Sequence, residues 1–282
     1  MNDWNGVGGK HVLLTGATSG IGLAAAKQLA RARAKLTLVA RSHERAAVAI
    51  REIGSPADVL IADLTSQDAV RDLAREIMDR CPQIDILINN AGAIFLSRQL
   101  SPDGIELTWA LNHLAPFLLT NLLLDRLQAN APSRIITTAS GAHHGAKIPF
   151  EDLNAEHGYS GYRRYRETKL ANILFTRALA RRLHDTGITA NCFRPGFVAT
   201  RFNHNNGWLP TMVMVLLRPI SRTPERGAET LTWLADTPEL AQVTGGYFMD
   251  KRRQVPSDEA QDDDAAEQLW RISENQVGVA MA

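Results

Sequence analysis

The chain has little of what several classes of protein depend on. Its 282 residues include only two cysteines, Cys81 and Cys192, which stand far apart, so neither a disulfide framework nor a cysteine-rich metal site is expected. Both are predicted to be buried thiols. Thirty-one Lys and Arg residues balance thirty Asp and Glu residues, which leaves a net charge of +1. Because the whole molecule carries no strong field, no nucleic-acid partner is expected.

Long hydrophobic runs are also absent. No stretch of about 18 uninterrupted apolar residues occurs, and residues 1–5 lack the charged and apolar regions of a secretory signal. These absences predict a protein without a membrane span and a cytoplasmic location. Hydrophobic residues still make up 45% of the chain, enough for a sizeable core.

Short apolar runs alternate along the chain with segments of helical spacing. Strands are expected at residues 11–14, 36–40, 58–61, 84–88, 134–138, 188–193 and 247–249, and helices near 23–33, 43–53, 66–80, 103–129 and 160–184. Strands without polar alternation, separated by helices, are typical of a parallel sheet buried on both faces. The sequence therefore predicts an α/β fold: a single Rossmann-type doubly wound parallel sheet of about seven strands with helices on both faces.

One domain is expected over residues 1–282, with its core at about 8–250. Residues 203–226 interrupt the alternation with an apolar run, 212–217, between polar flanks. Such a run is typical of a lid over an apolar substrate and equally of a subunit contact, so a homo-oligomer, dimer or tetramer, is left open. The stretch at about 251–282 is polar, which predicts a solvated tail with one short helix near 257–272.

A glycine-rich turn follows the first expected strand. Gly16, Gly20 and Gly22 form the pattern Gly-x-x-x-Gly-x-Gly where the first helix should begin. Glycine permits the backbone angles of the turn and removes side chains that would hold a pyrophosphate away from the free amides of the helix. Purely structural glycines are the alternative. The flanking strand and helix favour a dinucleotide site, because ligands bind beyond the carboxyl ends of parallel strands.

Tyr165 and Lys169 stand four residues apart on an expected helix, so their side chains share one face. An ammonium beside a phenol favours the ionised phenol and lowers its pKa from about 10. An ordinary surface pair has the same spacing, so the glycine-rich turn is needed to favour chemistry. Tyr159 and Tyr162 are weaker candidates, because arginines, which do not exchange protons, stand four residues beyond them. We therefore predict that Tyr165 is a proton donor.

Further motifs follow in a fixed order. They are Thr15-Gly16-x-x-x-Gly20-Ile21-Gly22, Asn89-Asn90-Ala91-Gly92, Asn112, Ser140, Tyr165-x-x-x-Lys169 and Arg194-Pro195-Gly196. This set resembles the classical short-chain dehydrogenases/reductases over nearly the whole domain. Residues 103–106, 112–114 and 169–176 are most similar to the retinol-dehydrogenase-like branch. The resemblance implies an enzyme that transfers hydride between a nicotinamide cofactor and a carbonyl or alcohol.

The resemblance implies a catalytic set of Asn112, Ser140, Tyr165 and Lys169. Tyr165 would protonate the carbonyl oxygen, or act as the base in the oxidation direction. Lys169, with the oxidised nicotinamide, would lower the pKa of that tyrosine and would also hold the nicotinamide ribose. Ser140 would orient the substrate oxygen, and Asn112 would support a water that links the lysine to solvent. Hydride addition leaves negative charge on oxygen, so such donors are needed there.

The resemblance also implies a cofactor site. Its residues are Gly16, Thr18, Ser19, Gly20, Ile21, Gly22, Arg41, Asp63, Leu64, Asn89, Ala91, Gly92, Tyr165, Lys169, Pro195, Gly196, Val198 and Thr200. Asp63 would contact the adenine amino group, and it is equally suited to cap the next helix. Asn89, Ala91 and Gly92 would line the ribose, and Thr200 would reach the carboxamide or pyrophosphate.

The residues after the second expected strand favour NADP(H) over NAD(H). An acidic residue that accepts hydrogen bonds from the ribose is typical of NAD sites, and here Ala40 takes that place. Arg41 follows it, and a guanidinium can bind a 2′-phosphate with two parallel hydrogen bonds. A plain surface arginine is the alternative.

Other polar clusters are interpreted as structural. His143, His144 and His157 lack ligand spacing, so no metal is expected. The arginines at 163, 164 and 166, and those at 177, 181 and 182, are expected to form a solvated helix face. The leading hypothesis is an NADP(H)-dependent oxidoreductase acting on a moderately apolar small molecule. Two alternatives are a catalytically silent NADP(H)-sensing regulator and a reductase of carbon–carbon double bonds.

Overall fold

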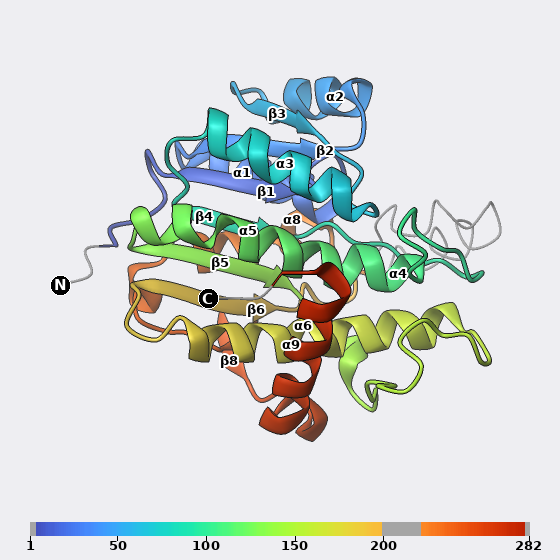
Figure 1. Cartoon of the computed structure of the whole chain (residues 1–282). Helices are drawn as coiled ribbons and strands as arrows, with labels where there is room; N and C mark the ends of the chain where they lie inside the picture. Colours follow the sequence, from blue (N-terminus) through green and yellow to red (C-terminus); the bar gives the residue numbers. More distant parts are fainter. Residues whose placement is uncertain (1–3, 199–220, 280–282) are drawn as a thin grey trace.

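The computed structural model describes residues 4–198 and 221–279, which form one eight-stranded sheet with helices on both faces (Figure 1). The strand order is β3-β2-β1-β4-β5-β6-β7-β8, parallel except for the antiparallel pair β7–β8. The strands are β1 His11–Thr15, β2 Lys35–Ala40, β3 Asp58–Ile61, β4 Ile86–Asn89, β5 Ser133–Thr138, β6 Ile188–Phe193, β7 Tyr247–Met249 and β8 Arg252–Gln254. The predicted α/β fold is confirmed, with one strand more than expected.

Helices pack on both faces of this sheet. They are α1 Gly20–Arg31, α2 His43–Ile53, α3 Gln67–Arg80, α4 Leu107–Trp109, α5 Ala115–Ala129, α6 Gly161–Arg182, α8 Pro224–Asp236 and α9 Asp263–Val277. Two separate hydrophobic clusters cover the two faces, because alternate residues of a strand point to opposite sides. Leu13 of β1 belongs to the cluster under α3, α5, α6 and α9, whereas Val12 and Leu14 belong to the cluster under α1 and α8.

Short polar side chains set where several helices begin. Ser42, Ser66, Ser160, Thr223 and Asp262 each accept a hydrogen bond from a backbone amide in the first turn of α2, α3, α6, α8 and α9. These bonds satisfy amides that have no partner within the helix. The cap of α3 is therefore Ser66, which corrects the capping role weighed for Asp63.

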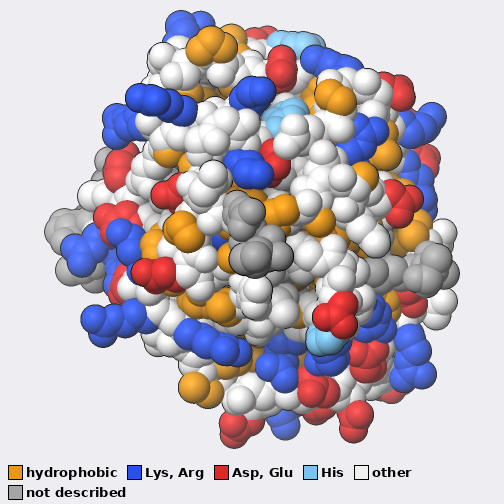
Figure 2. Space-filling model, turned by 90° about the vertical axis from the view of Figure 1, so that its left-hand side faces the viewer, with side chains coloured by type: hydrophobic (Ala, Val, Ile, Leu, Met, Phe, Trp, Pro, Cys, Tyr) orange, Lys and Arg blue, Asp and Glu red, His pale blue; other side chains and the backbone are white. Residues whose placement is uncertain are grey.

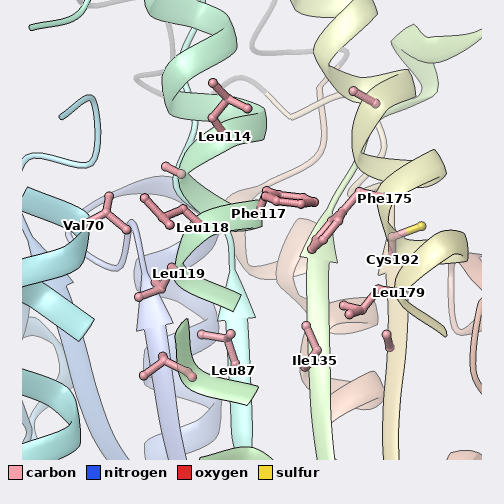
Figure 3. Packing of buried hydrophobic residues seen from close by; sticks show 14 of the residues in the cluster. Val70, Leu87, Leu114, Phe117, Leu118, Leu119, Ile135, Phe175, Leu179 and Cys192 are labelled. Atoms are coloured by element: carbon pink, nitrogen blue, oxygen red, sulfur yellow. The ribbon is translucent and has the colours of Figure 1, made fainter. Parts of the chain in front are cut away.

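The helix predicted at 103–129 is interrupted. Residues 103–106 lie outside it, α4 is a single turn, and a π-helical turn, Ala110–Leu114, precedes α5. By length and apolar composition the stretch Leu107–Ala129 could cross a membrane, but 83% of its apolar 18-residue window is buried inside the molecule. Figure 3 shows why, since Phe117 faces Phe175, and Leu114, Leu118 and Leu119 belong to the same buried cluster as Leu87 and Ile135.

The polar C-terminal stretch is folded, which corrects the predicted solvated tail. Strand β8 pairs with β7, and α9 begins at Asp263, later than the predicted short helix. One face of α9, with Leu269 and Trp270, is buried in the same cluster as α6. The apolar residues of α9 recur at helical spacing but stand among many charged residues. The segment is therefore polar on average, and the prediction from composition missed its apolar face.

Charged residues of both signs are spread over the surface. On the face shown in Figure 2, Lys and Arg side chains are interspersed with Asp and Glu. Arg177, Arg181 and Arg182 of α6 are not a plain solvated face, because they form ion pairs with Asp263 and Glu267 of α9. Of the expected insertion at 203–226, residues 203–220 lie outside the described residues.

Candidate active site

The carboxyl ends of β1, β4, β5 and β6 meet at one edge of the sheet, where the sequence motifs converge (Figure 1). The chain runs from β1 outward to β2 and β3 and then crosses back to β4 on the other side of β1. A ligand crevice forms at such a switch point, because neighbouring connections leave in opposite directions. The site is therefore built around the turn after β1.

The glycine-rich turn is packed too closely for side chains. A Cβ on Gly22 would lie 2.2 Å from the Gly16 carbonyl oxygen, and one on Gly16, whose φ is +69°, would lie 2.8 Å from Ala91 Cα. Ser19, the N-cap of α1, makes no side-chain capping bond, and no acidic residue stands in the first turn. The first amides of α1 are thus without a side-chain cap. This arrangement fits a pyrophosphate group.

Thr15 and Asn90 hold this turn against the end of β4. The Thr15 hydroxyl accepts hydrogen bonds from the Asn90 and Ala91 amides at 3.0 Å, and Asn90 Nδ2 donates to the carbonyls of Thr15 and Gly16. Asn89, which was in the predicted cofactor set, instead donates to Thr120 of α5 at 2.9 Å. Neighbouring residues of a strand face opposite ways, so the alternation predicts that one of the two asparagines faces the turn but does not say which one.

Tyr165 and Lys169 lie on α6 beside the end of β5. Lys169 is 3% exposed, its Nζ donates to the Thr138 carbonyl at 3.0 Å, and Nζ lies 5.5 Å from the centre of the Tyr165 ring. Burial lowers the pKa of Lys169 to about 8. Burial also raises the pKa of Tyr165 to about 12, against the hydrogen bond with Ser140, which lowers it. In the chain alone desolvation therefore dominates the pKa of Tyr165, and its lowering by Lys169 together with the oxidised nicotinamide stays a prediction.

Ser140 begins a short 3-10 turn, Gly141–His143, directly after β5. Its hydroxyl accepts a hydrogen bond from the Ala142 amide at 3.1 Å and also bonds to Tyr165. The serine hydroxyl and the tyrosine phenol thus lie next to each other at the end of β5. Two hydroxyls directed at one oxygen suit a carbonyl on which negative charge develops.

Asn112 lies in the π-helical turn and is buried. Its Nδ2 donates to the Ala93 carbonyl at 2.9 Å and to Thr168 Oγ1 at 3.1 Å, while its Oδ1 accepts from the Ala93 amide at 2.9 Å. A Cβ on Gly92 would lie 3.1 Å from this Oδ1, so only glycine fits there without a shift. The side chain joins the loop after β4 to α6 next to Lys169. Its support of a water stays a prediction.

Three other predicted cofactor residues, Arg41, Asp63 and Val198, follow the carboxyl ends of β2, β3 and β6. Arg41 is exposed and follows β2 directly. Asp63 is exposed and accepts hydrogen bonds from the amide and hydroxyl of Thr65, whereas Leu64 is buried in the core. Val198, in the loop after β6, forms an isolated β-bridge with the backbone of Arg222. Thr200 lies outside the described residues.

A buried charge cluster stands beside the site, where a solvated arginine was predicted. Arg164 is 1% exposed, and its Nε donates to Glu106 Oε2 at 2.8 Å, while Nη1 donates to Glu167 Oε2 at 3.1 Å. Its guanidinium also lies 4.6 Å from the centre of the Trp109 ring. The prediction of a solvated Arg164 is therefore wrong, because Trp109 of α4 and the carboxylate of Glu106 cover that side of α6.

Metal chemistry is not suggested by the described residues, 4–198 and 221–279. Among them no group of three His, Cys, Asp or Glu residues is arranged to hold an ion. His143 is instead fully buried, and both of its ring nitrogens form hydrogen bonds with backbone groups.

Comparison with known proteins gives concordant matches. The model of the short chain dehydrogenase family matches residues 10–207. Retinol dehydrogenase 14 of Mus musculus is 38% identical, with 96% of this chain and 86% of that protein covered. DnrU of Streptomyces sp. (strain C5), provisionally named a daunorubicin C-13 ketoreductase, is 39% identical, with 97% and 94% covered. The Pseudomonas aeruginosa RhlG/NADP complex superposes with a TM-score of 0.69 at 26% identity, with 92% and 98% covered.

Proposed function

The chain belongs to the short chain dehydrogenase family, and we propose on that premise that it transfers hydride between NADP(H) and the carbonyl or alcohol of a moderately apolar small molecule. One observation carries the proposal. Ser140 bonds to Tyr165, and Lys169 lies behind that tyrosine, at the sheet edge that also holds the glycine-rich turn. A site with a proton donor, a second hydroxyl and a phosphate cradle suits the reduction of a carbonyl.

The residues divide the work of this reaction. The nicotinamide cofactor supplies or takes up hydride when it is bound. The amides at the start of α1 would hold its pyrophosphate. Lys169 has three N–H donors and uses one on Thr138, so the others are free to hold ribose hydroxyls. Tyr165 would give its proton to the substrate oxygen, while Ser140 Oγ would donate a hydrogen bond that orients this oxygen.

Preference for NADP(H) is part of the proposal. Ala40 ends β2 without a carboxylate, and the exposed Arg41 follows it at the sheet edge where the adenosine ribose would lie. A guanidinium recognises a phosphate through two parallel hydrogen bonds. The similarity to a protein solved with NADP supports the same preference.

A cytoplasmic location and a small-molecule substrate complete the proposal. The stretch Leu107–Ala129 has the length and composition of a membrane span, but it is packed against the sheet. Its apolar residues are accounted for by this packing. The resemblance to proteins named for retinol and for a ketone favours an apolar carbonyl or alcohol.

Replacement of Tyr165 by phenylalanine tests the reaction. We expect kcat to fall at least about 100-fold, because the proton donor is lost, while the dissociation constant of NADPH changes less than about threefold. Tyr162→Phe is the matched control, since Tyr162 is an exposed phenol one turn earlier on α6. The measurement is NADPH oxidation with a panel of ketones, aldehydes and quinones, followed by product analysis.

Three outcomes distinguish the hypotheses. Equal activity of the Tyr165→Phe variant and the original protein would refute the role of this tyrosine. NADPH binding without turnover of any compound would favour the silent regulator. A saturated carbonyl product from an unsaturated substrate would favour the reductase of carbon–carbon double bonds.

A further inference from the structure

His143 lies directly behind the catalytic serine. It ends the 3-10 turn that Ser140 begins, and its side chain is 0% exposed. The centroid of the His144 ring is 4.1 Å away, and the ring of Tyr247 from β7 meets it edge-on at 5.2 Å. Close packing by two rings leaves the imidazole one orientation.

Two hydrogen bonds determine which ring nitrogen carries the proton. His143 Nδ1 lies 2.7 Å from the Ser140 carbonyl oxygen, and the Ser257 amide nitrogen lies 3.1 Å from Nε2. A carbonyl oxygen can only accept and an amide N–H can only donate. Nδ1 must therefore carry the proton, and Nε2 must accept. Both bonds require the same neutral tautomer, and a second proton on the ring would break the bond to Ser257.

The neutral state agrees with the surroundings of the ring. Burial lowers the pKa of His143 to about 4, and the neighbouring His144 and Arg194 act in the same direction. The hydrogen bond to Ser140, the second largest influence after burial, raises this pKa, and Glu259 does so too. Since Nε2 is already bonded to an amide, the ring is unsuited to bind a metal or to exchange protons with a substrate.

We propose that His143 is a positioning residue, which holds Ser140 in place against the segment that follows β8. The inference rests on the proposed function, because it assigns Ser140 its role in that reaction. Ser140 is held on two sides, by the Ala142 amide at its hydroxyl and by His143 at its carbonyl. The hydroxyl of Ser140 bonds in turn to Tyr165. The geometry of the catalytic pair therefore depends on Ser257, far away in the sequence.

The kinetic test compares variants of His143 in the full-length protein. His143→Phe keeps a ring but loses both bonds, and we expect kcat to fall about 10- to 100-fold, as for a misplaced catalytic group. The KM for NADPH should stay within about twofold, because the cofactor turn is not altered. His143→Asn keeps a donor near the Nδ1 position and should recover most of kcat, whereas His143→Gln places its amide at the other nitrogen and should not. His144→Phe is the control and should match the original protein.

A measurement on the resting protein tests the geometry without any substrate. Long-range ¹H–¹⁵N NMR spectra should show a proton on Nδ1 of His143 at pH 7 and none on Nε2. Hydrogen exchange of the Ser257 amide should speed up at least tenfold in His143→Phe and stay unchanged in His144→Phe.

The outcomes separate this inference from the proposed function. A proton on Nε2, or an unchanged Ser257 exchange rate, would overturn the inference whether or not a substrate is found. Full kcat in His143→Phe, with an active original protein, would overturn it while the proposed function stands. If His143→Phe does not fold, the Asn and Gln variants decide, since equal kcat in those two would contradict the inference.

Discussion

Lys169 holds an ammonium group where little water reaches it. It is 3% exposed, and burial lowers its pKa from the model-compound value of 10.5 to about 8. Below pH 8 Lys169 is charged in both states. Its ammonium is desolvated in the folded protein, whereas water solvates it in the unfolded chain, so this charge opposes folding. Lys169 is thus expected to lower the free energy of unfolding, a cost that is common for residues placed by function.

Lys169→Met should therefore stabilise the protein at neutral pH. Both states of the original protein are protonated below about pH 8, so the full cost is present there, on the order of 3 kcal/mol at most for a shift of this size. Between pH 8 and 10.5 the unfolded chain binds a proton that the folded protein does not, so this cost disappears. Urea unfolding of both proteins at pH 7 and pH 10 measures the difference. A difference that is independent of pH would contradict the prediction, and the exposed Lys35→Met is the control.

Arg41→Ala tests cofactor preference at the scale of one side chain. We expect the dissociation constant of NADPH to rise at least about tenfold, because a charge-assisted contact to phosphate contributes roughly 1.5–3 kcal/mol. The dissociation constant of NADH should change little. Arg51→Ala, at the other end of α2, removes the same charge from an exposed position. Equal losses for the two cofactors, measured by fluorescence titration, would rule out phosphate recognition by Arg41.

At the scale of elements, Glu106 joins the start of α4 to α6. Its carboxylate accepts hydrogen bonds from the Thr108 and Trp109 amides at 3.0 and 2.9 Å and from Arg164 Nε at 2.8 Å. The Tyr159 hydroxyl donates its proton to the Phe95 carbonyl at 2.7 Å and lies 3.2 Å from the same carboxylate. The cluster thus pins the loop after β4 and the entry to α6 just before Tyr165. A fully bonded buried cluster can hold these segments in one arrangement.

Arg164→Met should destabilise the protein by about 3–5 kcal/mol, because it leaves a buried carboxylate without its cation. Glu106→Gln together with Arg164→Met removes both charges and should cost less than the sum of the single changes. Arg163→Met is the control, since its side chain is 55% exposed and lies 3.7 Å from Glu167, and it should change stability by less than about 0.5 kcal/mol. The free energy of unfolding in urea is measured for the original protein, the two single variants, the double variant and the control, and additive costs would contradict coupling.

At the scale of the whole molecule, the C-terminal segment completes the core. Trp270 of α9 packs against Phe117 of α5 and Phe175 of α6, with ring centroids 4.9 and 5.9 Å apart. His113 of the π-helical turn bonds to Ser273 of α9 at 2.8 Å. Ser257, in the same part of the chain, bonds to His143 beside the site. Residues 257–277 are therefore part of the frame around Ser140 and the proposed site.

Trp270→Ala should cost about 3–5 kcal/mol, because it leaves a cavity beside the two aromatic side chains of Phe117 and Phe175. The exposed neighbour Arg271→Ala should stay within about 0.5 kcal/mol. Chemical unfolding measured by circular dichroism compares the two variants. A small loss at Trp270 would mean that α9 is only loosely attached, in agreement with a solvated tail.

Much of the fold could be predicted because its signals are local. Most strands of the sheet contain a short apolar run, and α2 lies at the predicted residues, between its N-cap Ser42 and its C-cap Gly54. The π-helical turn could not be predicted, because it depends on Asn112 meeting Ala93 and Thr168 across the site. Strand β8 is three polar residues, and its pairing with β7 is a long-range property.

The sequence by itself determined the family resemblance, the parallel sheet and the positions of Tyr165, Lys169 and Ser140. The spacing of motifs and the periodicity of hydrophobic residues are local signals that can be read without the fold. Only the tertiary structure decided which of Asn89 and Asn90 holds the glycine-rich turn, that Arg164 is buried, and that His143 connects Ser140 to Ser257. Burial and hydrogen-bond partners come from residues far apart in the sequence. The protonation states of Tyr165 and Lys169 follow from that burial, so no local pattern contains them.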